Sequence, residues 1–286
     1  MSLTIDELPA PHRGAKSLLL TLLGEFVHPT GGAVWTSTLV QGLATVDITE
    51  RNARQAIARL GEQGIVEAER RGRRTRWRLT DAGSRLLTAG TERIYSFGRR
   101  HLDWDGNWLL VICSIPETQR AIRHQFRTQL TFEGFGFLSP TIAISPHTNR
   151  ERAANEILRE LGLAADATTF VATSGTMTAD DAIRAGAWDL DAVADEYAAF
   201  IAEFGDEAGD APSRPVRPAA PADAFGTTLL LVDSWRRFPF TDPELPCQLL
   251  PADWIGDRAG DLFARRRAAV RSEAMAWYRQ LEADAS

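Results

Sequence analysis

The side chains best suited to chemistry in this chain are arginines gathered between residues 48 and 78. This stretch holds nine Arg and four Glu, a local charge of +5, whereas the whole chain carries −6. Guanidinium groups pair with phosphate and with base edges, so a basic cluster on an acidic chain indicates contact with nucleic acid. The alternative is a solvated helix and hairpin, in which charge, apolar periodicity and turn chemistry coincide by chance.

Apolar periodicity predicts a short helix in the first half of this stretch. Its apolar residues recur at i, i+3, i+4 and i+7, namely Ala53, Ala56, Ile57 and Leu60. Thr49 is a plausible N-cap, and Asp47 with Glu50 three residues later is an equally good capping box. A hairpin is then predicted around residues 71–74, with Gly72 supplying the turn. A capped helix followed by a basic hairpin is typical of a winged helix-turn-helix.

Two kinds of DNA contact are expected from this motif. Residues near the start of the helix would read base edges, because Arg pairs with guanine and Asn or Gln with adenine. These are Arg51, Asn52 and Gln55, and Thr49 is a further candidate for DNA binding. The remaining basic residues would hold phosphates and so fix the protein on the duplex. They are Arg54, Arg59, Arg71, Arg73, Arg74 and Arg76.

Length and composition indicate an ordinary cytoplasmic protein of two or three domains. The 286 residues are 44% hydrophobic and 24% charged, and the apolar runs at 18–23 and 229–232 are too short to span a bilayer. The first residues lack the basic and apolar regions of a secretion signal. The two cysteines, Cys113 and Cys247, are far apart, which argues against a disulfide framework or a zinc finger. We expect no membrane association.

The order of predicted elements favours an α+β protein with three domains. After a flexible tail at 1–15, helices at 16–28 and 35–44 precede the recognition helix and wing. A helix that restarts after the wing, capped by Thr80, closes the winged helix domain at 16–90. Alternating strands and helices at 108–115, 117–130, 135–138, 141–145, 149–161 and 168–173 predict a ferredoxin-like β-α-β-β-α-β domain at 91–178. Residues 179–286 form a helical C-terminal domain, interrupted by a Pro-rich connector at 205–223.

Catalytic patterns are weak in this sequence. The five histidines are scattered, and the sequence lacks Walker A, Gly-x-Ser-x-Gly and Gly-x-Gly-x-x-Gly motifs. Cys113 falls within an apolar strand, where a cysteine is usually a small core residue. We therefore expect no enzyme, no bound metal and no cofactor.

Several strings together resemble the PaaX family of bacterial transcriptional regulators, over residues 16 to 282. In the first third the match is the helix pattern at 54–60, then Gly72-Arg73-Arg74 and Leu79-Thr80-Asp81-Ala82-Gly83. In the middle it is Trp104-Asp105-Gly106-Asn107-Trp108, Pro116-Glu117 with Arg120, and Gly134-Phe135-Gly136-Phe137-Leu138-Ser139-Pro140. The most specific strings are Trp235-Arg236-Arg237-Phe238-Pro239, Asp242-Pro243-Glu244-Leu245-Pro246, Leu249-Leu250-Pro251 and Asp253-Trp254.

The resemblance implies a homodimeric repressor of an aromatic-acid catabolic operon, of the phenylacetate type. It implies a winged helix, a Cas2-like middle domain used for dimerisation, and a helical C-terminal domain. It also implies a CoA-thioester effector, typically phenylacetyl-CoA, that releases operator DNA. Cas2-like nucleases carry a metal-binding Asp where this chain has Ser114, a poor ligand for Mg²⁺. A metal-dependent nuclease and a CoA-thioester hydrolase are the enzymatic alternatives.

Five residues in the C-terminal half are candidates for effector binding. Trp188, Trp235 and Trp254 could stack on an aryl group, and Arg236 or Arg237 could meet the phosphates of CoA. The alternative is structural: the tryptophans fill a helical core, and the arginines cap a helix C-terminus ahead of Pro239.

Overall fold

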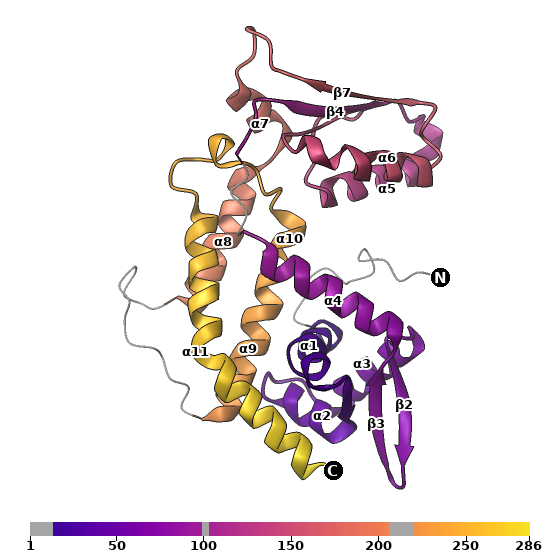
Figure 1. Ribbon diagram of the computed structural model, residues 1–286, viewed down its shortest axis with the longest axis vertical. Coiled ribbons are helices and arrows are strands. Elements are labelled where there is room, and N and C mark those ends of the chain that lie inside the picture. Colours follow the sequence, from indigo (N-terminus) through magenta and orange to yellow (C-terminus); the bar gives the residue numbers. More distant parts are fainter. Residues whose placement is uncertain (1–13, 99–102, 206–219) are drawn as a thin grey trace. The chain divides into compact units, whose positions relative to one another are not determined.

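The computed structural model describes residues 14–98, 103–205 and 220–286, which fall into two compact units (Figure 1). The first unit unites Met1–Ser96, Phe200–Arg237 and Ala259–Ser286, and the second unites Phe97–Ala199 and Phe238–Arg258. The segment 179–286, expected to be one helical domain, is therefore divided between the two units. Most of the predicted tail at 1–15 and connector at 205–223 lies outside the described residues.

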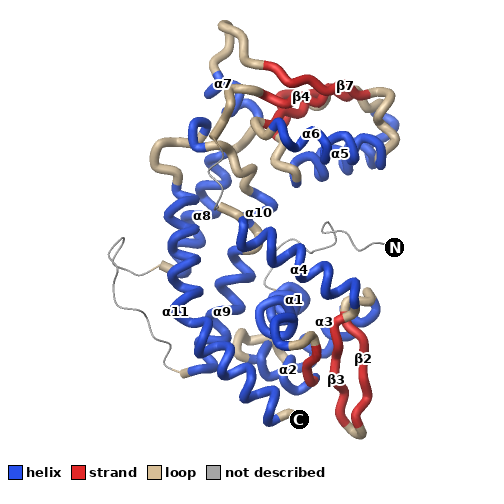
Figure 2. Tube along the Cα trace, in the orientation of Figure 1, coloured by secondary structure: helices blue, strands red, loops and turns tan. Residues whose placement is uncertain are grey.

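The first unit contains the expected winged helix-turn-helix. The N-terminal part of this unit runs α1 (Ala15–Leu22), β1 (Ala33–Trp35), α2 (Thr36–Ala44), α3 (Glu50–Glu62), β2 (Val66–Arg71), β3 (Arg74–Leu79) and α4 (Asp81–Ser96). A π-helical turn at Leu23–Val27 and a short 3₁₀ helix at His28–Thr30 prolong α1. The three strands form an antiparallel sheet in the order β1-β3-β2, with β2 and β3 as the wing (Figure 2).

Gly83 is required at the start of α4 for steric reasons. It is the last residue of the string Leu79-Thr80-Asp81-Ala82-Gly83. Thr80 caps this helix, because its Oγ1 accepts a hydrogen bond from Gly83 N at 2.9 Å. A Cβ at Gly83 would lie 2.1 Å from the carbonyl oxygen of Ile65. Only a residue without a side chain lets α4 leave the wing at this close approach.

Two helices from distant sequence complete the core of the winged helix. Residues of α9 (Pro221–Trp235) and α11 (Ile255–Asp284) belong to the same buried cluster as α1 and α3. The ring of Phe26 lies 4.3 Å from that of Phe225 on α9 and 5.6 Å from that of Tyr278 on α11. Because α9 is apolar around most of its circumference, it needs cover on several sides.

The second unit contains the predicted ferredoxin-like domain. Its elements are β4 (Trp108–Cys113), α5 (Arg120–Phe132), β5 (Gly136–Ser139), β6 (Ile142–Ser145), α6 (Glu151–Glu160) and β7 (Ala167–Ala172). The antiparallel sheet has the order β5-β6-β4-β7, so β6 separates the two strands that α5 connects. That is the split βαβ arrangement. Both helices cover one face of the sheet (Figure 1), and Val111, Phe126 and Leu158 meet in the core between them.

The remaining helices are short or contribute to both units. Helix α7 (Asp180–Ala187) and helix α10 (Phe238–Thr241) belong to the second unit, and α8 (Leu190–Phe204) and α11 contribute residues to both. The specific string at 242–246 has a structural role within the second unit. Asp242 accepts hydrogen bonds from Tyr197 Oη and from Glu244 N, each at 2.7 Å, and His147 Nε2 donates to the Glu244 carbonyl at 2.9 Å.

Candidate nucleic-acid interface

The predicted recognition helix is α3, and it buries the predicted apolar stripe. Ala53, Ala56, Ile57 and Leu60 are all buried. Of the two possible caps, the structure uses Thr49, whose Oγ1 accepts a hydrogen bond from Asn52 N at 3.4 Å. Asp47 has a left-handed backbone with φ of 61°, whereas an N-cap needs the extended conformation that Thr49 has.

The opposite face of α3 presents the residues predicted to read bases. Arg51, Asn52 and Gln55 are exposed, and their side chains have no partner among the described residues. Arg59 lies one turn beyond Gln55, also exposed and without a described partner. Arg54 instead forms an exposed ion pair with Glu50, Nε to Oε1 2.7 Å. This helix therefore offers donors of the kind that bind base edges and phosphates, on one surface.

The wing is a hairpin with a two-residue turn at its tip. Arg71 faces Arg74 across the strands, and Gly72 between them has φ of 64°, as the tight hairpin turns require. Arg73 stands at the tip, exposed and without a partner in the described part of the chain. Arg70 is likewise exposed and without a partner in the described part of the chain. It was not among the predicted phosphate contacts, because nothing in the sequence separates it from the neighbouring arginines.

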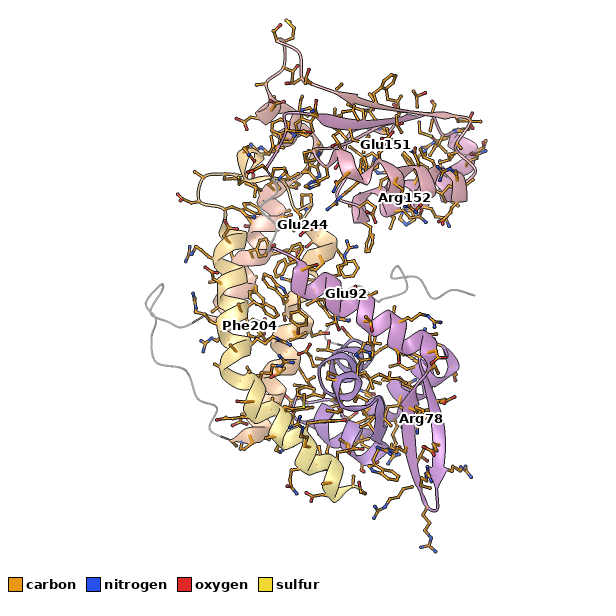
Figure 3. All side chains as sticks on the ribbon, in the orientation of Figure 1. Arg78, Glu92, Glu151, Arg152, Phe204 and Glu244 are labelled. Atoms are coloured by element: carbon orange, nitrogen blue, oxygen red, sulfur yellow. The ribbon has the colours of Figure 1, made fainter. Side chains whose placement is uncertain are left out.

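Acidic groups hold most of the other wing arginines. The register places Glu67, Glu69 and Arg71 on the same face as Arg74, Arg76 and Arg78. Glu69 pairs with Arg71 and, at 3.5 Å, with Arg78, which is labelled in Figure 3.

Arg74 and Arg76 have partners at the far end of the sequence. Arg76 Nη2 lies 3.8 Å from Glu282 Oε1, and Arg74 donates to the carbonyl oxygens of Ala285 and Ser286. Sequence reasoning missed Glu282, because no local pattern relates it to the wing. Of the six arginines predicted to hold phosphates, only Arg59 and Arg73 are thus without a described partner.

The predicted effector residues are divided between the two units. Trp188 and Trp254 belong to the second unit, whereas Trp235, Arg236 and Arg237 belong to the first. Trp235 is 3% exposed and stacks on Phe263, with ring centroids 4.6 Å apart, and Trp254 is 8% exposed. Both tryptophans therefore fill cores.

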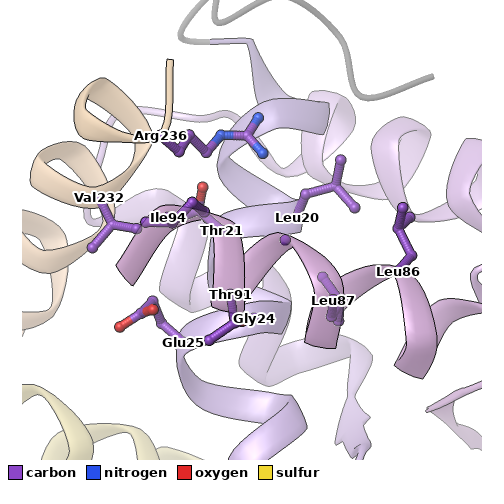
Figure 4. Close-up of a pocket in the computed structure, with 11 residues that line it drawn as sticks. Leu20, Thr21, Gly24, Glu25, Leu86, Leu87, Thr91, Ile94, Val232 and Arg236 are labelled. Carbon is purple, nitrogen blue, oxygen red and sulfur yellow. The ribbon is translucent and has the colours of Figure 1, made fainter. Parts of the chain in front are cut away.

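Arg236 joins a buried polar network between α1 and α9. Its Nε donates to Asp233 Oδ1 at 3.1 Å and its Nη2 donates to Ser17 Oγ at 2.6 Å. Ser17 and Thr21 also donate to Asp233 Oδ1, at 2.7 and 3.1 Å. Arg236 lines a small hollow with Leu20 and other residues of α1, α4 and α9 (Figure 4). The hydrogen bonds of Arg236 to Asp233 and Ser17 are those of a structural residue.

The described residues contain no group of three His, Cys, Asp or Glu side chains that could hold a metal ion. Ser114 follows directly after β4, and Cys113 is buried, which raises the pKa of its thiol. In the described part of the chain, no helix is long and apolar enough to cross a membrane.

Comparisons with known proteins agree with this architecture. Family models match at residues 14–83 (PaaX-like protein), 101–183 (PaaX protein central Cas2-like domain) and 188–280 (PaaX-like protein C-terminal domain). The transcriptional repressor PaaX of Escherichia coli K12 is 30% identical over 272 residues, which cover 91% of this chain and 82% of that protein. An uncharacterized protein of Mycobacterium tuberculosis, Rv0674, shares the fold with a TM-score of 0.62 at 23% identity, covering 93% of this chain and 99% of that one. This chain therefore belongs to the PaaX family of regulators.

Proposed function

We propose that this protein is a cytoplasmic, sequence-specific repressor of an aromatic-acid catabolic operon, of the phenylacetate type. The observation that carries the proposal is the outward face of α3, where Arg51, Asn52 and Gln55 are exposed and free to meet base edges. The wing places Arg73 at its exposed tip, where it would hold a phosphate. The name of the Escherichia coli relative, a transcriptional repressor, supports the same function.

The effector in this proposal is a CoA thioester, phenylacetyl-CoA or a related acyl-CoA, that releases the operator. Release requires a ligand with different affinities for the DNA-binding and the released state. We infer that the chain is not an enzyme, because Ser114 replaces the carboxylate expected of a Cas2-like nuclease. Nuclease and thioester hydrolase activity are the outcomes that would contradict this inference.

We propose a homodimer that pairs through β7 of the middle domain. This strand ends the sheet order, and all six of its residues are uncharged. Phe170 and Val171 are 52% and 53% exposed. An uncharged edge strand with exposed apolar residues is ready to pair with another strand, and antiparallel pairing with its own copy satisfies a twofold axis. Such a dimer would recognise a palindromic operator.

The experiment that tests the function is fluorescence anisotropy on DNA from upstream of the protein's own gene, at fixed salt. We expect binding that is much tighter than to random DNA and is lost on titration with phenylacetyl-CoA. Binding that ignores phenylacetyl-CoA would retain the repressor and redirect the search to other acyl-CoA esters. Binding no tighter than to random DNA would refute the proposed repression at this site, and turnover of the thioester would favour the hydrolase.

Two substitutions separate base contacts from phosphate contacts. Gln55→Ala should weaken discrimination at one operator position by about 1–3 kcal/mol. Arg73→Ala should weaken binding to all sequences equally and flatten the salt dependence. The affinities of both variants for operator and random DNA provide the comparison. Equal effects of the two variants on sequence discrimination would refute this division.

A further inference from the structure

The last turn of α11 lies against the start of α2 and the wing, all within the first unit. Glu282 Oε2 accepts hydrogen bonds from Thr38 Oγ1 at 2.7 Å and from the backbone N–H of Trp35 at 3.3 Å. Its other oxygen, Oε1, lies 3.8 Å from Arg76 Nη2. One carboxylate thus contacts both helix α2 and strand β3.

The residues after Glu282 extend this contact to a second arginine. Arg74 Nη1 donates to the carbonyl oxygens of Ala285 and Ser286, each at 2.7 Å. Trp35 Nε1 donates to Ser286 Oγ at 3.3 Å, and that hydroxyl donates to the Glu282 carbonyl at 2.9 Å. The turn therefore presents acceptor oxygens to two arginines that the sequence assigns to phosphates.

The donors around Glu282 are the set that binds a DNA phosphate. They comprise a helix N-terminus with its backbone N–H, a hydroxyl group and nearby guanidinium groups. Helix α2 has no acidic residue in its first turn and no side-chain cap, so Glu282 supplies the anion there. In helix-turn-helix complexes, the first helix of the motif crosses the DNA backbone. Glu282 thus occupies a place suited to a phosphate.

We propose that the last turn of α11 competes within the molecule with the DNA backbone for Arg74, Arg76 and the N-terminus of α2. This inference rests on the proposed DNA-binding function. Only the last turn has to leave, because Ala274 and Tyr278 are buried in the core and anchor the helix just before it. The Glu282 side chain is 18% exposed and holds its partners until DNA displaces it.

The first test compares Glu282→Gln with the wild-type protein on a short random-sequence duplex over a series of salt concentrations. Removing the competing carboxylate should tighten binding at low salt by about threefold or more. The slope of the plot of log K against log salt should stay the same, because DNA makes the same phosphate contacts in both proteins once the last turn of α11 has left. Equal or weaker binding by a variant that unfolds at the wild-type temperature would overturn the proposal.

Asp284→Asn is the matched control, because it removes the same charge two residues away. Asp284 accepts a hydrogen bond from Gln280 at 2.8 Å and forms no hydrogen bond or ion pair with the wing in the described part of the chain, so its variant should bind as the wild type does. A gain in affinity shared by both variants would reflect net charge alone and would overturn the proposal.

Hydrogen exchange of the wild-type protein provides a test that needs no substitution. Binding of the duplex should accelerate exchange at residues 279–286 and leave the buried turns of α11 unchanged. Slower exchange at 279–286 would overturn the proposal. If neither the wild type nor Glu282→Gln binds the random or the upstream duplex, the proposed DNA-binding function is refuted as well. If the wild type and Glu282→Gln bind with the same affinity, only the competition is refuted.

Discussion

Substitution of Arg236 distinguishes a structural role from a ligand-binding role. The buried contacts of this side chain predict that its removal causes a large loss of stability. Arg236 is 8% exposed, and burial lowers the pKa of its guanidinium, an effect that Asp233 opposes. Arg236→Ala leaves Asp233, which is 2% exposed, without its cation. Removing one partner of a buried ion pair costs about 3–5 kcal/mol.

This loss can be measured as a thermal midpoint. A change of 1 kcal/mol shifts the midpoint by about 2–4 °C in a domain of about 150–250 residues, so Arg236→Ala should lower it by roughly 6–20 °C. Circular dichroism without any ligand is the assay. Arg271→Ala is the control, because Arg271 is exposed on α11 and has no described partner, and it should leave the midpoint unchanged.

A double variant tests the cause of the loss. Replacing both members, as Asp233→Leu with Arg236→Met, should recover much of the midpoint, because paired apolar residues substitute well for a buried ion pair. The reasoning would be refuted if Arg236→Ala kept the wild-type midpoint and abolished release of DNA by phenylacetyl-CoA. Arg236 would then be an effector ligand rather than part of the core.

Three further predictions follow from single residues. Burial and the nearby Arg150 lower the pKa of His147 from 6.5 to about 4, so unfolding takes up a proton as the pH falls from 6.5 to 4. Stability should fall by roughly 3 kcal/mol across that window, and His147→Gln should show a smaller fall in denaturant titrations. Phe170→Asp should convert a dimer to a monomer in sedimentation velocity, because it places a charge on the edge strand. Gly83→Ala should lower the free energy of unfolding by about 1–3 kcal/mol, because its Cβ clashes with the Ile65 carbonyl. Gly90→Ala, which has open space around it on the same helix, should raise the thermal midpoint slightly.

The local sequence pattern was sufficient to predict most of the helices and strands, although not β1, and to predict which face of the recognition helix is buried. The stripe from Ala53 to Leu60 is buried because a 3.6-residue repeat fixes which side chains share a face. The order of strands and helices in the middle domain was also correct. The choice between Thr49 and Asp47 as cap was open in the sequence, because both have the right side chains, and the backbone conformation decides it.

Packing partners could not be predicted in the same way. Periodicity shows that a face of α9 is buried, and it does not show that Phe225 packs against Phe26 in the winged helix. The same limit explains why Trp235 and Trp254 were both candidates for ligand stacking. An aromatic residue that fills a core and one that lines a binding site have the same sequence signature, and burial separates them.

Fewer arginines are free to bind DNA in the structure than the charge count of the sequence indicates. Counting charges over residues 48–78 gives +5, but Glu282 comes from more than two hundred positions away and Glu69 pairs with arginines on its own hairpin. Within residues 48–78, the arginines without a partner among the described residues are then those on the outer face of α3 and at the end of the wing. They are Arg51, Arg59, Arg70 and Arg73. Since a free guanidinium binds phosphate without first losing another anion, these four should dominate the affinity for DNA, and the contacts of Arg74 and Arg76 should depend on displacing α11.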